Sequence, residues 1–281
     1  MACLFCCAVG VYNEDTFTFW SPGEATMEFT IHGSVMQALE ITLQQGESIF
    51  TESGGMAWMS DGIDMKTSSR GGLGKAVGRM LAGESFFMTT YTCQAPQGMI
   101  TFTPESPGKI IPVPLKAGHS IIAQKDAFMC AEESVELAMH FRKRLGTGLF
   151  GGEGFILQKL TGPGTAFIEI AGEMQMIDRQ AGQKLKIDPG HIAMYEPTCD
   201  YDVEMVKGVM NWLGGGEGLF LATIKGPGKV WLQTMPLSNL ASKLRGYLGT
   251  KEAGLLRGAV RLAGRAGELP DGVRAELGGP P

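Results

Sequence analysis

The sequence predicts an all-β protein made of three repeated β subdomains, followed by a short C-terminal helical tail. A motif in which a Gly-Glu pair opens an apolar run occurs three times, as LAGESFF from Leu81, FGGEGFI from Phe150 and GGGEGLF from Gly214. Glycine makes up 41 of the 281 residues, and many of these glycines separate short apolar runs, as tight turns between strands require. The Gly-Glu pairs lie 69 and then 64 residues apart, and a motif repeated at such a spacing indicates a repeat architecture.

The three Gly-Glu pairs are the candidate repeat positions of the fold. They are Gly83 and Glu84, Gly152 and Glu153, and Gly216 and Glu217. A catalytic acid needs a partner whose environment contrasts with its own, and no such partner accompanies all three copies. We therefore expect each carboxylate to be structural and to accept hydrogen bonds from backbone N–H groups of a turn.

Two further elements recur around these pairs. A proline-glycine element follows each pair, at Pro96 to Gly98, Pro163-Gly164 and Pro227-Gly228. A second element precedes each pair, as LQQGESIF from Leu43, LKAGHSII from Leu115 and RQAGQKLKI from Arg179. Together they place the three subdomains at residues 27–103, 104–172 and 173–236, with an N-terminal extension at 1–26 and a tail at 237–281.

Short strands fill each subdomain. Residues 26–49 alternate in the manner of two strands, with inward-facing candidates at Val35, Leu39, Ile41, Leu43 and Ile49. Strands are also predicted at MAWM and IDM, which flank the turn Asp61-Gly62. Others are SFFMTTY, MITF, the strictly alternating stretch 135–141, FILQKL, TAFIEI, KLKI, HIAMY, VEMV, LFLATI and KVWLQTM. Strands of about five residues between closely spaced turns are typical of a β-sandwich or barrel.

The first 26 residues differ from the rest, since MACLFCCAVGVY is apolar, holds three cysteines and has no Lys or Arg. It therefore lacks the basic start of a signal peptide. Our preferred interpretation is a dispensable extension ahead of Met27. The alternatives are S-acylation of Cys3, Cys6 or Cys7, and metal binding by Cys3 with Cys6, for which no second cysteine pair exists.

The tail predicts an amphipathic helix. Leu237, Leu240, Leu244 and Leu248 recur at helical spacing, and Lys and Arg occupy the opposite face. We expect the part up to Leu248 to pack on the β structure, while glycines interrupt the helix from Gly249 onward. The alternative is a basic helix at a membrane surface.

Charge and composition exclude several classes of function. The net charge is −5 and Lys and Arg concentrate in the tail, so a general nucleic-acid-binding role is disfavoured. No apolar stretch is long enough for a transmembrane helix. Cys93, Cys130 and Cys199 each stand alone, which indicates buried thiols in a reducing, cytoplasmic compartment.

No catalytic, cofactor-binding or metal-binding constellation is predicted, and we expect a non-enzymatic protein. The four histidines, His32, His119, His140 and His191, show no metal-ligand spacing. His119 and His191 occur in what look like related turns, GHS and PGH, so they either face solvent or line a ligand site. The Gly-rich stretch from Arg70 lacks the pattern of a phosphate-binding loop.

The segments LAGESFF, LQQGESIFTESGGMAWMS and GGGEGLFLATIKGPGKVWLQTMPLSNLA resemble the TRAP-like family of bacterial and archaeal proteins, which is related to the mitochondrial "altered inheritance of mitochondria" (mitochondrial biogenesis) proteins. The resemblance runs from about Met27 to about Leu248. It implies three TRAP-like β subdomains of the double-stranded β-helix type, each similar to the subunit of the tryptophan RNA-binding attenuation protein. It also implies a homotrimer in which nine such units close a ring.

The resemblance implies no established biochemical activity, although the mitochondrial relatives are associated with inner-membrane organisation. The attenuation protein reads RNA with repeated Lys and Arg, and no such position recurs across the three copies here. We therefore expect a non-enzymatic scaffold or interaction protein that forms a trimeric β ring with itself and meets an unidentified protein or a membrane surface. The alternative is a small-ligand-binding ring with sites at the subdomain junctions.

Overall fold

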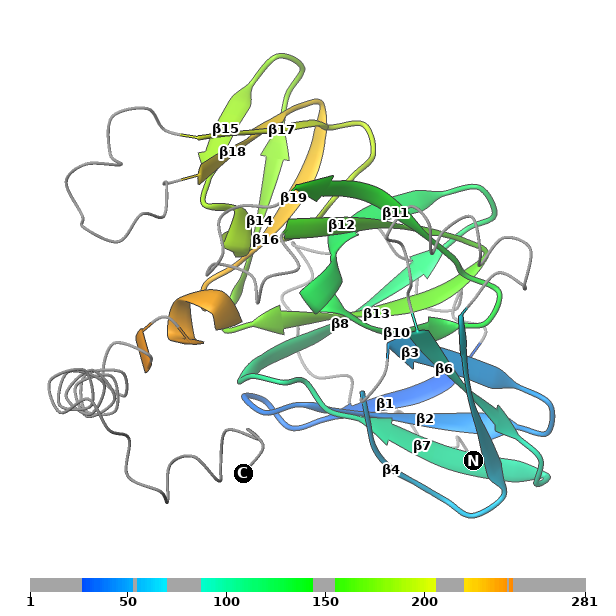
Figure 1. The fold of residues 1–281 in the computed structure, drawn as a ribbon. Helices are drawn as coiled ribbons and strands as arrows, with labels where there is room; N and C mark the ends of the chain where they lie inside the picture. Colours follow the sequence, from blue (N-terminus) through cyan, green and yellow to red (C-terminus); the bar gives the residue numbers. More distant parts are fainter. Residues whose placement is uncertain are drawn as a thin grey trace, which may run out of the picture. The chain divides into compact units, whose positions relative to one another are not determined.

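The computed structural model describes residues 27–52, 55–69, 87–143, 155–205, 220–241 and 243–244. Almost all regular structure in these residues is β, which confirms the predicted β-rich class (Figure 1). The strands are β1 (Glu28–His32), β2 (Ala38–Gln44), β3 (Ser48–Glu52), β4 (Met56–Met59), β5 (Ile63–Ser69), β6 (Phe87–Cys93), β7 (Gln97–Phe102), β8 (Gly108–Leu115), β9 (Ser120–Gln124), β10 (Phe128–Glu132), β11 (Glu136–Lys143), β12 (Phe155–Thr161), β13 (Gly164–Ala171), β14 (Met174–Arg179), β15 (Lys184–Ile187), β16 (Ile192–Tyr195), β17 (Asp200–Met205), β18 (Phe220–Lys225) and β19 (Gly228–Gln233). Two 3₁₀ turns, η2 (Lys125–Ala127) and η3 (Pro189–His191), lead into β10 and β16.

The strands form four antiparallel sheets. The first has the order β1-β2-β7-β4 and the last has the order β15-β18-β17. Between them lie two six-stranded sheets, with the orders β5-β6-β3-β10-β13-β8 and β11-β12-β9-β16-β19-β14. Each six-stranded sheet therefore joins three strands of one stretch of chain to three strands of the next.

The same pairings occur in three successive stretches of chain. In the middle stretch β8 and β10 both pair with β13, while β9 and β11 both pair with β12. In the first stretch β2 and β4 pair with β7, and β3 and β5 pair with β6. In the last stretch β14 and β16 pair with β19, and β15 and β17 pair with β18.

Successive stretches are joined by one pairing each. Strand β10 pairs with β3, with Cys130 opposite Thr51, and β16 pairs with β9, with Met194 opposite Ala123. These two joints create the six-stranded sheets (Figure 1). Both joints are antiparallel ladders of backbone hydrogen bonds.

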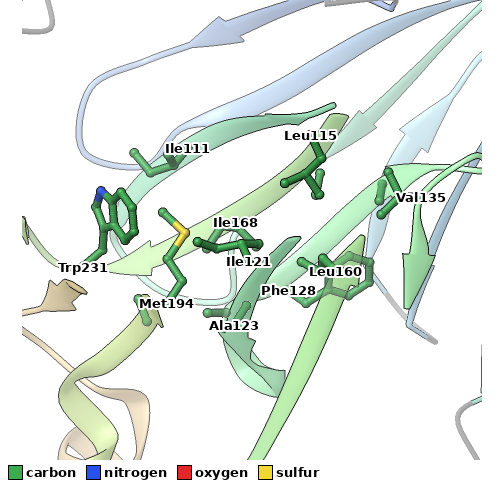
Figure 2. Packing of buried hydrophobic residues seen from close by; sticks show 14 of the residues in the cluster. Ile111, Leu115, Ile121, Ala123, Phe128, Val135, Leu160, Ile168, Met194 and Trp231 are labelled. Atoms are coloured by element: carbon green, nitrogen blue, oxygen red, sulfur yellow. The ribbon is translucent and has the colours of Figure 1, made fainter. Parts of the chain in front are cut away.

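Three apolar clusters fill the spaces between the sheets. The first includes Leu39, Ile41 and Ile100, and the third includes Phe155, Tyr195 and Val230. In the middle cluster, Met194 and Trp231 of the last stretch point toward Ile111, Ile121 and Ile168 of the middle stretch (Figure 2). Side chains at the joints thus reach back into the core of the preceding stretch.

The glycine element predicted before each Gly-Glu pair is a tight turn in all three stretches. Gly46, Gly118 and Gly182 have φ of 86°, 78° and 82°, values that residues with a side chain rarely adopt. Each turn joins the first two strands of the shared pairing pattern, β2 to β3, β8 to β9 and β14 to β15. Most of the predicted strands match those observed, with Leu39, Ile41, Leu43 and Ile49 fully buried. The sequence predicts two strands in residues 26–49, however, whereas three strands, β1, β2 and β3, begin in this stretch.

Two details of the predicted pattern are wrong. Val35 is 65% exposed, because it precedes β2 in the chain segment that leads out of β1. The strict alternation of 135–141 does not put all four apolar residues on one face. A bulge between Met139 and Phe141 shifts the register, so Val135 belongs to the middle cluster and Phe141 packs on the third.

A short helix follows the last strand of the sheets. Residues 237–241 and 243–244 are helical, which confirms a helix directly after Pro236. The chain divides into two compact parts, residues 1–237 and 238–281, and the helix lies mainly in the second part. The N-terminal extension and the tail from 245 onward lie outside the described residues, so the cysteine and membrane interpretations of these segments stay predictions.

Candidate functional site

The predicted repeat positions lie outside the described residues. This applies to Gly83, Glu84, Gly152, Glu153, Gly216 and Glu217 alike, and the structural role proposed for them stays a prediction. The described residues do show a repeated polar contact, at positions that the sequence analysis missed. At the end of β10, Glu132 Oε1 accepts the backbone N–H of Thr165 at 2.9 Å, and directly after β16, Glu196 Oε2 accepts the N–H of Lys229 at 2.9 Å.

The first stretch makes the same contact with a different side chain. Ser60, which follows β4, accepts the backbone N–H of Met99 through Oγ at 2.8 Å. In all three places a side chain at the end of the third strand, or directly after it, accepts a hydrogen bond from a backbone N–H near the start of the sixth strand. The sequence signal was available, because a polar residue follows MAWM, FMCA and IAMY.

Removing one of these acceptors should destabilise the fold. In Glu132→Ala the N–H of Thr165, which is 1% exposed, loses its partner, and we expect the free energy of unfolding to fall by about 1–3 kcal/mol. Glu132→Gln keeps a carbonyl acceptor and should lose less than half as much. Urea unfolding of both variants beside the exposed control Glu136→Ala measures this, and equal loss in the Ala and Gln variants would contradict it.

A partly buried carboxyl, that of Glu169, lies on β13 of the middle stretch. Burial, together with the negative charges of Glu105 and Asp126, raises the pKa of Glu169 to about 8. Its Oε2 accepts the backbone N–H of Glu105 at 3.4 Å. Since the folded state holds this proton more tightly than the unfolded state, Glu169 contributes stability that is present below about pH 4.5 and is lost as the pH rises through 8.

Replacing this carboxyl by an amide should remove that loss. We expect Glu169→Gln to match the parent chain near pH 5 and to exceed its free energy of unfolding by about 1–3 kcal/mol at pH 8.5. Chemical unfolding at a series of pH values measures the difference. A difference that does not grow with pH would contradict the account.

A pocket of about 330 Å³ lies beside β15 in the last stretch. Its apolar wall comes from Leu185, Ile187 and Leu232, and its polar wall includes Gln175, His191 and Thr234. The polar wall is held in place, because His191 Nδ1 lies 2.8 Å from the carbonyl of Gln233 and Gln233 Nε2 donates to the carbonyl of Gly190 at 2.9 Å. The pocket is thus a preformed recess with a mixed lining.

The structure corrects the predicted relation between the two turn histidines. His119 is exposed in the turn between β8 and β9, whereas His191 belongs to η3 and lines the pocket. The counterpart of His119 in the last stretch is Gln183, since both follow the left-handed glycine of the turn. The two histidines therefore do not form a matching pair of sites.

The described residues contain no group of three or more His, Cys, Asp or Glu side chains that could hold a metal ion. Cys93, Cys130 and Cys199 are free and buried, as predicted. Burial, together with the nearby charges of Glu196, Asp200 and Asp178, raises the pKa of Cys199 to about 11, which keeps this thiol protonated and unreactive. None of the helical residues that the structure describes forms a segment long and apolar enough to span a membrane.

Two strand edges are the remaining feature of the site. Strand β4 is the last strand of the first sheet, and β15 is the last strand of the final sheet. Within the described residues, neither has a partner on its outer side. Strand β1 pairs with β2 and has no counterpart in the other stretches. Counted from β2, β4 is the third strand of the first stretch, and β15 is the second strand of the last stretch, the same two positions that join successive stretches at β10·β3 and β16·β9.

Fold and site together define a β-sheet protein whose described residues offer uncovered strand edges and a recess with a mixed lining. Comparison with known proteins identifies its family: residues 29–235 match the family described as mitochondrial biogenesis AIM24, and the chain belongs to it. An uncharacterized protein of Streptococcus pyogenes serotype M6 is 32% identical over 234 residues, which cover 80% of this chain and 92% of that protein. A crystal structure of a protein from Streptococcus pyogenes matches with a TM-score of 0.64 and 29% identity, and covers 79% of this chain and 100% of that one.

Proposed function

We propose that the chain is a non-enzymatic scaffold or interaction protein that assembles with itself, head to tail, into a closed homotrimer. Its body is proposed to consist of three copies of one six-strand TRAP-like unit, with boundaries at 27–103, 104–172 and 173–236. The pairing pattern supports this, because it is the same in all three stretches and its breaks fall between β7 and β8 and between β13 and β14.

The observation that carries the proposal is the repeated joint between units. Twice within the chain, the third strand of one unit pairs with the second strand of the unit before it. The chain ends this series with β4 and β15 uncovered, and an uncovered edge strand is a template for a further strand. If β4 of a second copy pairs with β15, every joint in the assembly is of one kind, and a heterologous contact of this kind closes into a ring.

The register of this contact follows from the two joints that the chain already makes. Met194 lies opposite Ala123, and Tyr195 lies opposite Ile122. We align the units on the glycine turn between their first two strands and on the bulge in their third strand. The corresponding pairs between two copies are then Trp58 opposite Ile187 and Met59 opposite Lys186. Three units in each copy then give the ring of nine that the family resemblance implies.

The mass of the full chain in solution tests the proposal. Light scattering coupled to size-exclusion chromatography is expected to give about 90 kDa, three times the 30.0 kDa chain, at micromolar concentration. A single species at the monomer mass would overturn the proposal.

A membrane-surface role is the second part of the proposal and rests on the basic tail. Anionic lipid attracts each nearby Lys or Arg by about 1 kcal/mol. Co-sedimentation with anionic vesicles, with and without residues 249–281, tests it. Binding at low salt that requires these residues would support a cytoplasmic scaffold at a membrane surface, and absence of binding by the full chain would remove it.

The alternative function is a small-ligand-binding ring, and the recess beside β15 is the observation that favours it. In the proposed assembly this recess lies at the junction between two copies, where the alternative places its sites. A ligand-binding ring requires that the recess stay open after assembly.

A further inference from the structure

We propose that the recess beside β15 is the binding site for the Trp58 side chain of a second copy of this chain, an inference that rests on the proposed head-to-tail assembly. Trp58 is 52% exposed on β4 and belongs to the few large apolar side chains that the described residues leave in solvent. We call the Trp58 side chain the anchor and the recess beside β15 of the other copy the socket.

The anchor is recognised from what its counterparts do inside the chain. Each third strand carries a bulge at the same place, and the residue that follows it faces the sixth strand: Cys130 opposite Phe167, Met194 opposite Trp231, and Trp58 opposite Thr101. The first two pairs are buried in the core of the preceding unit. Trp58 has no such preceding unit among the described residues, and it is exposed.

Each of these pairs contains one aromatic ring. In the two internal joints the ring is Phe167 or Trp231 on the sixth strand, whereas at the chain's first unit the sixth strand carries Thr101 and the ring is Trp58 on the third strand. A cross-strand exchange of large and small side chains keeps similar bulk on one face of the sheet. At this position the first unit therefore carries one large ring in its cross-strand pair, as the two units that form the internal joints do.

The socket is recognised in the same way. Met194 and Trp231 point toward Ile111, Ile121 and Ile168 (Figure 2). By position in the paired strands, the counterparts of these three residues in the last unit are Gln175, Leu185 and Leu232. All three line the recess. The recess is thus the place where a further unit would insert its paired side chains, and among the described residues β15 has no strand on its outer side.

The mixed lining of the recess fits an indole better than it fits an aliphatic side chain. Leu185, Ile187 and Leu232 supply apolar contact, while Gln175 and Thr234 replace the isoleucines Ile111 and Ile170 of the middle unit. An indole combines a large apolar body with one N–H donor, and such side chains dominate binding energy at protein interfaces. The recess therefore offers hydrogen-bond acceptors at two positions where the middle unit has isoleucine.

The affinity between copies tests the proposal. We expect Trp58→Ala to weaken association by about 30-fold or more, and Trp58→Phe to weaken it less, because the ring is kept. Gln175→Trp places a second indole at the recess of the same chain and is expected to dissociate the assembly as strongly as Trp58→Ala. Both sites are exposed on the isolated chain, so circular dichroism should show both variants folded.

The expected readout is the mass by light scattering across a dilution series, with tryptophan emission that shifts to longer wavelength as the parent chain dissociates and shifts less in Trp58→Phe. A folded Trp58→Ala chain that stays assembled at the same concentrations as the parent would overturn the proposal while leaving head-to-tail assembly intact. A parent chain that is monomeric throughout would overturn both. A mixture of the Trp58→Ala and Gln175→Trp chains has one intact joint, between Trp58 of the second variant and the recess of the first. It should therefore give heterodimers and no trimer, and a mixture that stays monomeric at concentrations where the parent assembles would contradict the socket.

Discussion

Replacing Phe167 by alanine is expected to lower the free energy of unfolding by about 3–5 kcal/mol, the largest loss for any single substitution discussed here. Phe167 is fully buried on β13 but packs in the cluster of the first unit, where its ring lies edge-on to Phe29 at 5.0 Å between centroids. Truncation leaves a cavity between two units, and the surrounding sheets are fixed by ladder hydrogen bonds on both sides.

The matched control is Ile170→Ala on the same strand, which faces the middle cluster. Because isoleucine is smaller than phenylalanine, this substitution should lower the free energy of unfolding by about 2–4 kcal/mol. The two variants should also differ in where protection from hydrogen exchange is lost. Phe167→Ala should weaken β2 and β7 as well as the middle unit, because the cavity opens between units, and loss confined to the middle unit would contradict the joint described here.

If the proposed trimer forms through β4, replacing Met59 by proline is expected to convert it into monomers while leaving the chain folded. Ser60 N–H donates to the carbonyl of Met99 at 2.8 Å, so Ser60 and Met99 form a hydrogen-bonded pair of the β4·β7 ladder. Bonded and non-bonded pairs alternate in an antiparallel ladder, so the N–H of Met59 points away from β7 and toward the open edge. Proline at this position removes only that outward donor.

Trp58→Pro is the contrasting variant, because the N–H of Trp58 points into the β4·β7 ladder. It should destabilise the chain itself, whereas Met59→Pro should change the melting temperature of the monomer little. Analytical ultracentrifugation of Met59→Pro measures the shift in mass. A Met59→Pro chain that remains trimeric at low micromolar concentration would show that β4 is not the edge through which copies pair.

The strands and turns of this fold could be predicted from sequence because each is locally encoded. The alternation of Leu39, Ile41 and Leu43 sets one face of a strand, and the glycine at 46, 118 and 182 sets the turn that follows the first strand of each unit. The bulge in β11 could not be predicted, because the alternating pattern through Met139 is the same with or without it. Its position depends on β12, which lies opposite.

The candidate site could not be predicted from the sequence, for a different reason. Sequence reasoning singled out the glutamates of the Gly-Glu pairs, because they recur with their neighbours, yet the acceptors seen in the described residues are Ser60, Glu132 and Glu196. Serine and glutamate share only the ability to accept a hydrogen bond, so the position does not repeat by residue type. The roles of Trp58 and the recess depend on which edges remain uncovered, and the sheet order decides that.

Covalent capture of the joint between copies tests the central claim most directly. The register places Met59 of one copy opposite Lys186 of the next, within the separation of about 5.5 Å that a disulfide bridges. In a chain with Cys3, Cys6 and Cys7 replaced by serine, the pair Met59→Cys and Lys186→Cys should give covalent dimers and trimers on oxidation, and nothing larger. The pair Met59→Cys and Ile187→Cys points to opposite faces and should stay monomeric. Equal cross-linking by both pairs, or by neither, would contradict head-to-tail pairing of β4 with β15, and a ladder beyond the trimer would contradict the closed ring.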